Sequence, residues 1–389
     1  MALAHLGADV IRVDPLGGAT DTRRLPLAPN GVSLYWCSLN RGKRSVEIDT
    51  RTEAGRALVA RLLANTGPDG GIVLTNAVDQ RWLEYGQLKH HRSDLIHVHI
   101  QGYNDGAPAV DYTVNAEVGL PLLTGAPDST QPVNHVLPAW DLLTGLHAAI
   151  GILAAVRDRR ATGHGCSITV SLADVATSTM GQLGFIADAI VNKSTRLREG
   201  NYLYGTFGCD FETADGGRVM VVALTPRHWH RLVAATGLEA VMAALEPALG
   251  ASLDKEEDRY NHREVLGSLL RPWFARRSLL EVANELKDSG VLWSSYQSVK
   301  DLVNGENSLI ARSTIFVDVE QPGVGRYPVA GSVLRVPERG PVGAPAPQLG
   351  EHTTEVLAEL LESKDTEILE LVTEGTIATR DASLGGQAK

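Results

Sequence analysis

The feature that most constrains the fold is a repeated alternation of a helix end, a glycine turn and a short apolar strand. In the first repeat, "ALAHLGADVIRVD", Gly7 ends a helix and a strand runs from Val10 to Val13. The plan recurs in "GGIVLTNA" and in "LKHHRSDLIHVHIQGYNDGAP", whose strand is expected at residues 95–100. This spacing predicts an α/β fold whose large domain has a Rossmann-like, doubly wound parallel sheet.

Ligands bind such sheets at the carboxyl ends of the strands. The segments after Val13, Leu74 and Ile100 are therefore expected around one crevice. Between the first two lies a predicted helix, "TRTEAGRALVARLLANTG", with Thr52 as its cap. Its apolar face is expected to consist of Ala57, Leu58, Leu62 and Leu63.

The pattern divides the chain into three parts. Residues 1–195 form the predicted large domain, which includes one helix over "ADVATSTMGQLGFIADAIV". Residues 200–305 form a smaller α+β domain, in which Asp215-Gly216 is expected to turn a hairpin. Residues 313–389 are rich in proline and glycine and are predicted to cross back to the large domain, ending in helices that begin at "EHTTEVLAELL".

Composition excludes several classes of function. The chain has 46 acidic and 36 basic residues, a net charge of -10, which argues against nucleic acid and anionic membranes as partners. Its 3 cysteines are widely spaced, which fits neither a disulfide framework nor a zinc site. No signal peptide and no run of the ~20 apolar residues needed to span a bilayer were found, so we expect a cytoplasmic protein.

One acidic residue, Asp141, begins an apolar helix in "NHVLPAWDLLTGLHAAIGILAAV". The helix is expected to reach Arg160 and to have one apolar face formed by Leu142, Leu146, Ala149, Ile150 and Leu153. Aspartate is a preferred N-terminal cap, so local sequence favours a structural role. The same helix end would also keep the carboxylate ionised, as a nucleophile requires. Local physics allows both interpretations.

The densest basic stretch near the expected crevice is "LNRGKRSVEIDTRT", which contains Arg41, Lys43, Arg44 and Arg51. It is a candidate anchor for the phosphates of a nucleotide-like ligand, and a solvated strand edge is an equally good interpretation. Asp14, after the first strand, is a weak candidate for gripping a ribose, because no GxGxxG motif precedes it.

Other reactive side chains give little signal. The histidine pairs at 90 and 91, at 97 and 99, and at 228 and 230 lack carboxylate or cysteine partners for a metal, so surface or core positions are expected and no metal site is predicted. Ser171 lies in no GxSxG motif, which argues against a hydrolase triad. Cys209 has no neighbouring histidine and is expected to be structural.

Read together, several stretches resemble the class III CoA-transferase family. They follow the family's order over most of the chain: "LGADVIRVD", "LNRGKRSVEID", "AWDLLTGLHAAIGILAAVRDRRATGHGCSITVSLAD" and "LGEHTTEVL". The resemblance implies that Asp141 is the catalytic nucleophile and that an acyl-CoA is the small-molecule substrate, with no tightly bound cofactor. It also implies an interlocked homodimer.

Four further strings resemble a subgroup that moves CoA between the two carboxyl groups of one mesaconate molecule: "VDYTVNAEVGLPLLTG", "VNHVLPAWD", "GNYLYGTFGCDFET" and "EQPGVGRY". Two alternatives stay open, an intermolecular CoA-transferase and an inactive CoA-binding or scaffold protein. The family's racemases need a histidine where this chain has Val110, so two-base proton exchange is not expected. The glycine-run loop of the formyl-CoA transferases is absent, which weakens intermolecular transfer.

The resemblance also assigns binding residues. CoA contacts are expected at Thr50, Arg51, Asn76, Ala77 and Arg81, and substrate contacts at Tyr112, Asn134, His135 and Tyr204. The family's first strand and most of its first helix would precede Met1, and such a strand is normally central to the sheet. We therefore expect a sheet that lacks a central strand, and a misassigned start codon is the favoured explanation. If the short form is real, we expect it to fold poorly or to bind CoA weakly.

Overall fold

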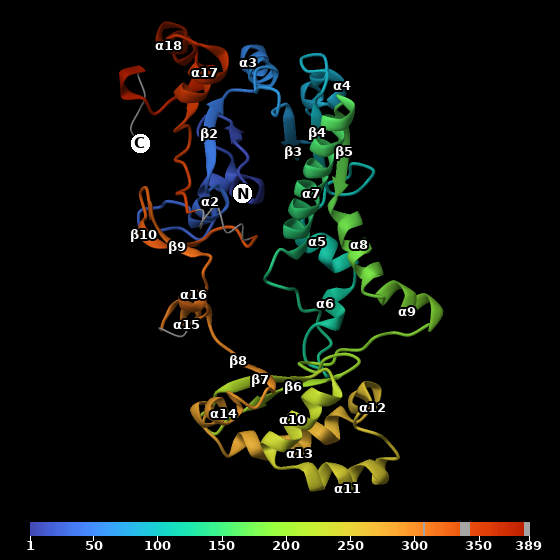
Figure 1. The fold of residues 1–389 in the computed structure, drawn as a ribbon. Coiled ribbons are helices and arrows are strands. Elements are labelled where there is room, and N and C mark those ends of the chain that lie inside the picture. Colours follow the sequence, from blue (N-terminus) through green and yellow to red (C-terminus); the bar gives the residue numbers. More distant parts are fainter. Residues whose placement is uncertain (306–307, 335–342, 385–389) are drawn as a thin grey trace. The chain divides into compact units, whose positions relative to one another are not determined.

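The computed structural model describes residues 1–305, 308–334 and 343–384 (Figure 1). The chain divides into two compact units: the first combines Met1–Val114, Pro138–Thr179 and Leu309–Lys389, and the second combines Asn115–Leu137 and Met180–Ser308. The sequence-based boundaries, 1–195, 200–305 and 313–389, differ because they assign residues 115–137 to the large domain, and they stay predictions. Residues 335–342 of the expected crossing segment lie outside the described residues.

The first unit contains a three-stranded sheet with the order β1-β2-β11. β1 (Val10–Asp14) runs parallel to β2 (Lys43–Ile48), and β11 (Ile377–Ala378) pairs with β2 in the antiparallel direction. The helices α3 (Glu53–Ala64), α17 (Thr353–Leu361) and α18 (Asp365–Thr373) bury their apolar side chains with this sheet. The C-terminal helices therefore share one core with β2.

α3 begins where the sequence predicts. Thr52 is its cap: its Oγ1 accepts a hydrogen bond from the backbone N–H of Gly55 at 3.0 Å and donates one to the carbonyl of Asp49 at 2.8 Å. Leu58, Leu62 and Leu63 are buried as expected. Ala57 is exposed, whereas Gly55 and Ala60 are buried in its place.

We expect Thr52→Ala to lower the free energy of unfolding by about 1 kcal/mol, because a free N–H at the helix start loses its acceptor. Urea denaturation monitored by circular dichroism measures the change. Thr52→Ser is the matched control, since it keeps the hydroxyl. Equal loss in the two variants would contradict a capping role.

The first unit also contains a fully parallel sheet with the order β3-β4-β5. Its strands are β3 (Ile72–Thr75), β4 (Ile96–Gln101) and β5 (Cys166–Ser171). The predicted mixed α/β fold with parallel strands is confirmed, but the strands form two three-stranded sheets and not one continuous sheet. Among the described residues β3 has a partner strand on one side only, and the side chain of Leu74 is exposed.

α7 (Ala139–Thr162) packs against β4 and β5. Its buried side is formed by small and apolar side chains, Ala148, Ile152 and Ala155, which meet Ile96 and Val98 of β4. The apolar face predicted from the sequence lies elsewhere on the helix: Leu142, Leu146, Ile150 and Leu153 are exposed and Ala149 is half-buried. Helical periodicity detects an apolar stripe but does not say what covers it.

By length and composition α7 would be long enough and apolar enough to cross a membrane, contrary to the expectation from the sequence. One such helix is weak evidence, because the core helix of a soluble protein meets the same test. The contacts of α7 with β4 and β5 place it in the first unit as a packed helix.

The second unit contains an antiparallel sheet with the order β6-β7-β8. Its strands are β6 (Phe207–Glu212), β7 (Arg218–Ala223) and β8 (Leu292–Ser295). As predicted, Asp215-Gly216 turns the hairpin between β6 and β7, and Gly216 has a φ of 77° that suits glycine. The helices around the sheet are α10 (Pro226–Thr236), α11 (Glu239–Leu249), α12 (Glu256–Asn261), α13 (Arg263–Ala275) and α14 (Leu279–Leu286).

The helix predicted after β5 is interrupted. α8 (Leu172–Gln182) and α9 (Phe185–Val191) are separated at Gly184, whose φ of 80° ends the first helix. The remaining elements are short: α1 (Ala2–His5), η1 (Thr20–Arg23), α2 (Leu34–Leu39), η2 (Arg81–Leu83), α4 (Tyr85–Leu88), α5 (Asp111–Glu117), α6 (Leu120–Leu123), α15 (Val299–Val303), α16 (Leu309–Arg312), β9 (Phe316–Gln321), β10 (Gly325–Ala330) and η4 (Ala382–Leu384).

Candidate active site

The start of α7 is capped by a residue distant in sequence. The N-cap position is Pro138, which offers no side-chain acceptor, and Asp141 lies within the first turn. The carboxylate of Asp111, at the start of α5, accepts hydrogen bonds from the backbone N–H groups of Trp140 at 2.7 Å and Asp141 at 3.2 Å. Asp111 is therefore the capping residue, and of the two interpretations that local sequence left open for Asp141, the capping one does not hold.

This arrangement frees the side chain of Asp141, which is exposed while Asp111 is 2% exposed. Partial desolvation raises the pKa of Asp141, and the nearby charge of Asp111 raises it further, while Arg24 lowers it. The helix end was expected to hold this carboxylate in its ionised form. The pKa of Asp141 is raised instead, first because the carboxylate is partly desolvated and second because Asp111 places a negative charge at the same helix N-terminus.

A carboxylate with a raised pKa is a stronger base and a better nucleophile once it is ionised. Arg24 belongs to this environment and was not found by sequence reasoning. Its guanidinium lies over the ring of Tyr35, 4.7 Å from the centroid. No local pattern connects Arg24 with Asp141, so no sequence signal could have identified it.

The expected CoA contacts after β2 lie on a tight turn. Thr50 is half-buried, and its backbone N–H donates to the carbonyl of Ile48 at 3.0 Å. Arg51 has a side chain that is 81% exposed and forms a two-pronged ion pair with Asp49, with Nε and Nη2 at 2.8 and 2.9 Å from its carboxylate oxygens. The ion pair fixes the guanidinium at the surface beside the carboxyl end of β2.

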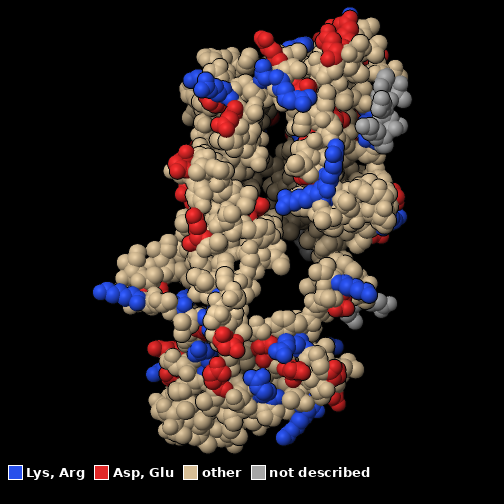
Figure 2. Space-filling model, turned by 180° about the vertical axis from the view of Figure 1, so that it is seen from behind, with Lys and Arg blue, Asp and Glu red and all other residues tan. Residues whose placement is uncertain are grey.

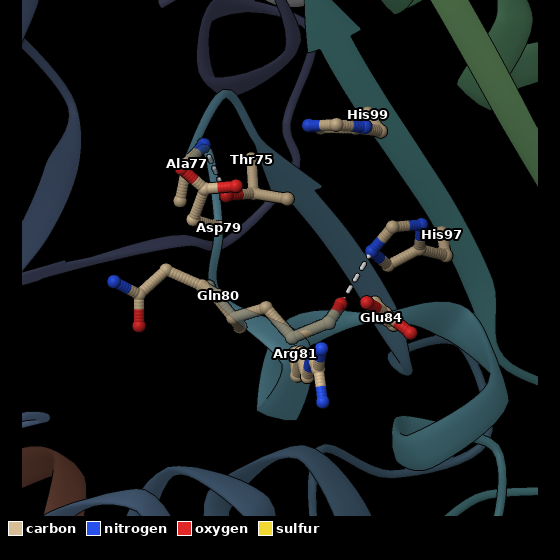
Figure 3. A pocket seen from close by; sticks show the side chains of 9 residues that line it. Thr75, Ala77, Asp79, Gln80, Arg81, Glu84, His97 and His99 are labelled. Atoms are coloured by element: carbon tan, nitrogen blue, oxygen red, sulfur yellow. Dashed lines mark hydrogen bonds between the residues drawn. The ribbon is translucent and has the colours of Figure 1, made fainter. Parts of the chain in front are cut away.

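The expected contacts after β3 surround a cavity. Ala77 and Arg81 line a pocket of about 390 Å³ together with Thr75, Asp79, Gln80, Leu83, Glu84, His97 and His99 (Figure 3). Asn76 is exposed beside it but does not line it. The backbone N–H of Ala77 donates to Oγ1 of Thr75 at 3.1 Å, which holds the turn after β3 in place. The structure thus brings Ala77 and Arg81 together at one strand end.

The basic stretch does not form a cluster of free cations. Arg44 pairs with Asp9, Glu355 and Glu359, and Lys43 donates to Oδ1 of Asn40 at 2.9 Å. Burial lowers the pKa of Lys43 to about 8, and Arg12 contributes to the shift. The candidate phosphate anchor is thus largely engaged in internal contacts.

Asp14, the weak candidate for binding a ribose, is also engaged in internal contacts. Asp14 is 2% exposed and pairs with Arg12, whose Nη2 lies 2.9 Å from its Oδ1. Asp21 binds the same guanidinium at 2.8 Å. The carboxylate of Asp14 is therefore neutralised within the protein and is not presented to a ligand.

The expected substrate contacts are divided between the two units. Tyr112 follows Asp111 on α5 in the first unit and is 40% exposed. Asn134, His135 and Tyr204 belong to the second unit. There, Oδ1 of Asn134 accepts from Nδ2 of Asn115 at 2.6 Å, and the guanidinium of Arg196 lies 3.4 Å from the ring centroid of Tyr204. Their substrate contacts stay predictions.

Other reactive groups have structural surroundings. Burial raises the pKa of the Cys209 thiol to about 12, which makes it a poor nucleophile. Oγ of Ser171 donates to the carbonyl of Gly102 at 3.2 Å and accepts from the N–H of Asp174 at the same distance. The described part of the chain contains no group of three or more side chains placed to hold a metal ion.

Charge is mixed over the surface. Figure 2 shows lysine and arginine side chains interspersed with aspartate and glutamate on the face drawn. A nucleic-acid partner would need a basic stripe. The face drawn has no continuous stripe of this kind.

Comparison with known proteins gives the family. The model of CoA-transferase family III matches residues 1–353. The chain belongs to CoA-transferase family III, and it is an enzyme. The structure of a CaiB/BaiF family protein from Brucella suis is similar, with a TM-score of 0.74, 25% identity, and coverage of 92% of this chain and 93% of that one.

Two curated relatives are informative. The chain is 46% identical to 2-methylfumaryl-CoA isomerase of Chloroflexus aurantiacus over 98% of its own length and 94% of the relative's. It is 30% identical to succinyl-CoA:mesaconate CoA-transferase of Haloarcula hispanica over 92% and 91% of the two chains. The family predicted from the sequence is therefore confirmed.

Proposed function

We propose that this CoA-transferase family III enzyme is an isomerase that moves CoA within one molecule, converting 2-methylfumaryl-CoA into 3-methylfumaryl-CoA. The observation that carries the proposal is the exposed carboxylate of Asp141, held at the start of α7 by the Asp111 cap. The 46% identity to an isomerase of that name over 98% of the chain supports the choice of substrate.

In the proposed reaction, ionised Asp141 attacks the thioester carbonyl. The C–S bond breaks, leaving a mixed anhydride and CoA thiolate. The thiolate then attacks the aspartyl carbonyl, which releases mesaconate and forms an aspartyl-CoA thioester.

The second half repeats these steps from the other end of the acid. The other carboxylate of mesaconate attacks the aspartyl-CoA carbonyl and expels the thiolate, giving a second anhydride. Attack of the thiolate on the mesaconyl carbonyl yields the product and restores Asp141. No oxidant or other reactant is consumed, and coenzyme A takes part only as a portion of the substrate.

Thr50, Arg51, Asn76, Ala77 and Arg81 are the proposed CoA contacts. They follow β2 and β3, which are parallel strands of two sheets in the first unit. The exposed guanidinium of Arg51 and that of Arg81 suit phosphate groups. Tyr112, Asn134, His135 and Tyr204 are the proposed contacts of the dicarboxylate, and we place the enzyme in the cytoplasm.

The proposed assembly is an interlocked homodimer whose large domain completes a Rossmann-like doubly wound sheet. An exposed apolar stripe on α7, formed by Leu142, Leu146, Ile150 and Leu153, supports association, because a soluble protein rarely leaves such a stripe uncovered. A second copy of the chain is the proposed cover.

The decisive experiment incubates purified protein with 2-methylfumaryl-CoA and separates the two regioisomers by chromatography. We expect the 3-methyl isomer to accumulate to an equilibrium mixture. Boiled protein is the control. No interconversion by folded protein would contradict the proposed reaction.

The 30% sequence identity to a succinyl-CoA:mesaconate CoA-transferase favours one alternative reaction, the transfer of CoA between two separate acids. Isotopically labelled free mesaconate distinguishes the two. We expect no label in the product, because the intramolecular route retains the released acid. Label entering at the rate of turnover would favour the intermolecular enzyme.

A further inference from the structure

A closed loop of the second unit leads into two of the expected substrate contacts. The loop runs from Pro121 to Val133, and the backbone N–H of Val133 donates to the carbonyl of Pro121 at 2.9 Å. Compact loops whose ends adjoin in this way are frequently functional. Asn134 and His135 follow the loop directly, so its closure determines where these two residues lie.

The guanidinium of Arg198 binds four backbone carbonyl groups of this loop. Nε donates to the carbonyl of Thr124 at 2.9 Å, and Nη1 donates to that of Ser129. Nη2 donates to the carbonyls of Pro121 at 3.2 Å and Gln131 at 2.8 Å. Within the described residues this guanidinium has no ion pair with a carboxylate. Its charge-assisted hydrogen bonds therefore serve the shape of the loop.

The segment that carries Arg198 forms no helix or strand, and it runs from α9 back toward α6 (Figure 1). It is nevertheless fixed on both sides of this residue. The guanidinium of Arg196 lies 3.4 Å from the ring centroid of Tyr204, and Glu199 accepts a hydrogen bond from the hydroxyl of Tyr260. The two tyrosine rings are themselves neighbours, with centroids 5.3 Å apart. Arg198 is thus presented to the loop by a packed cluster.

A second contact joins this segment to the loop two residues further on. Gly200 has a φ of 60°, and a Cβ added to it would lie 3.3 Å from Cδ of Pro127. The backbone of the segment therefore approaches the loop closely at a residue without a side chain. Arg198 and Gly200 together hold the loop along its length.

Asn134 has a donor available for a ligand. Its Oδ1 accepts from Nδ2 of Asn115 at 2.6 Å and from the backbone N–H of His135 at 3.2 Å, which holds the amide in one orientation. The residue is exposed, and its Nδ2 has no hydrogen-bond partner in the part of the chain that the structure describes. An amide N–H donates to a carboxylate, which only accepts. The position of this donor depends on the loop that precedes it.

We propose that Arg198 is a positioning residue that keeps the freed dicarboxylate in the site between the two halves of the reaction, by holding the loop that leads to Asn134 and His135. The inference rests on the proposed isomerase function, in which mesaconate leaves Asp141 once and returns to it. A rigid loop has its donors in place before the acid is released. A loosened loop lets the acid exchange with the solution, and the transfer of CoA becomes partly intermolecular.

The test supplies labelled free mesaconate during turnover of 2-methylfumaryl-CoA. We expect label in the product of Arg198→Gln, none with the wild type, and less with Arg198→Lys, because an ammonium group replaces only part of the planar fork. KM should rise about 10-fold in Arg198→Gln while kcat changes much less, since the weakened contacts act on ground state and transition state alike. Arg276→Gln, at an exposed arginine after α13 in the same unit, is the matched control and should behave as the wild type.

Label incorporated per turnover does not depend on the amount of folded enzyme, so a merely structural arginine would lower the rate without admitting label. Label-free product from the folded variants would overturn the proposal, as would label in the wild-type product. Arg198→Lys decides the matter if Arg198→Gln does not fold. Isomerisation with label excluded from every variant would refute only the role of Arg198, whereas no isomerisation by the wild type would refute the reaction and this inference together.

Discussion

Asp141→Asn is expected to lower kcat for isomerisation by at least about 10³-fold, because an amide does not form the anhydride and removal of a covalent nucleophile has effects of this size or larger. Asp141→Ala should behave alike. The rate is measured by resolving the two regioisomers over time. Asp158→Asn, an exposed aspartate near the other end of α7, is the matched control and should retain full activity.

We also expect Asp141→Asn to affect the stability of the protein. The pKa of Asp141 is raised in the folded protein, so the folded state holds this proton more tightly than the unfolded chain. The resulting stabilisation is present below the unfolded pKa and is lost as the pH rises through the folded pKa. At neutral pH the ionised group thus disfavours folding, and Asp141→Asn is expected to have an unchanged or higher Tm. A large fall in Tm would contradict the stability prediction, and unchanged turnover would contradict the role of Asp141 as nucleophile.

Asp111 is expected to control both the helix and the charge on Asp141, and two substitutions separate these effects. Asp111→Asn keeps an oxygen acceptor for the N–H groups of Trp140 and Asp141 but removes the charge. The pKa of Asp141 should then move down toward its usual range. Since only the ionised form attacks, the acidic limb of the pH profile of kcat/KM should shift to lower pH.

Asp111→Ala removes the acceptor as well. We expect it to lower the free energy of unfolding by about 1–2 kcal/mol, because two backbone N–H groups at the start of α7 lose their partner. Activity should fall further than in Asp111→Asn, because the first turn that carries Asp141 loosens. Denaturation and pH profiles of the two variants provide the comparison. An identical acidic limb in Asp111→Asn and the wild type would show that Asp111 does not tune the nucleophile.

The ends and turns of several helices and strands were predicted from the sequence, because local chemistry determines them. Gly7, Thr52 and Asp215-Gly216 end or turn elements through their own backbone preferences, and the structure has the expected element at each. The apolar stripe of α7 was predicted, but periodicity contains no information on neighbours and did not show that most of this stripe is exposed. The family pattern led to Asp141 where helix physics alone favoured a cap.

The parts that sequence reasoning missed depend on contacts between distant segments. Asp111 reaches the start of α7 from another helix, and nothing near either residue signals this bond. His97 and His99 do carry a signal, two imidazoles at strand spacing within an apolar run, but only the fold shows that they line a cavity with the turn after β3. The sequence analysis considered these two histidines only as metal ligands and expected surface or core positions for them.

The cap on α7 has a consequence for how the thioester oxygen is stabilised during attack. Helix N-termini often serve as oxyanion holes, since their free N–H groups point at a developing negative charge. Here the N–H groups of Trp140 and Asp141 already bind the carboxylate of Asp111. In the proposed reaction the helix therefore supplies the attacking group, and these two N–H groups are not free to hold the tetrahedral oxyanion.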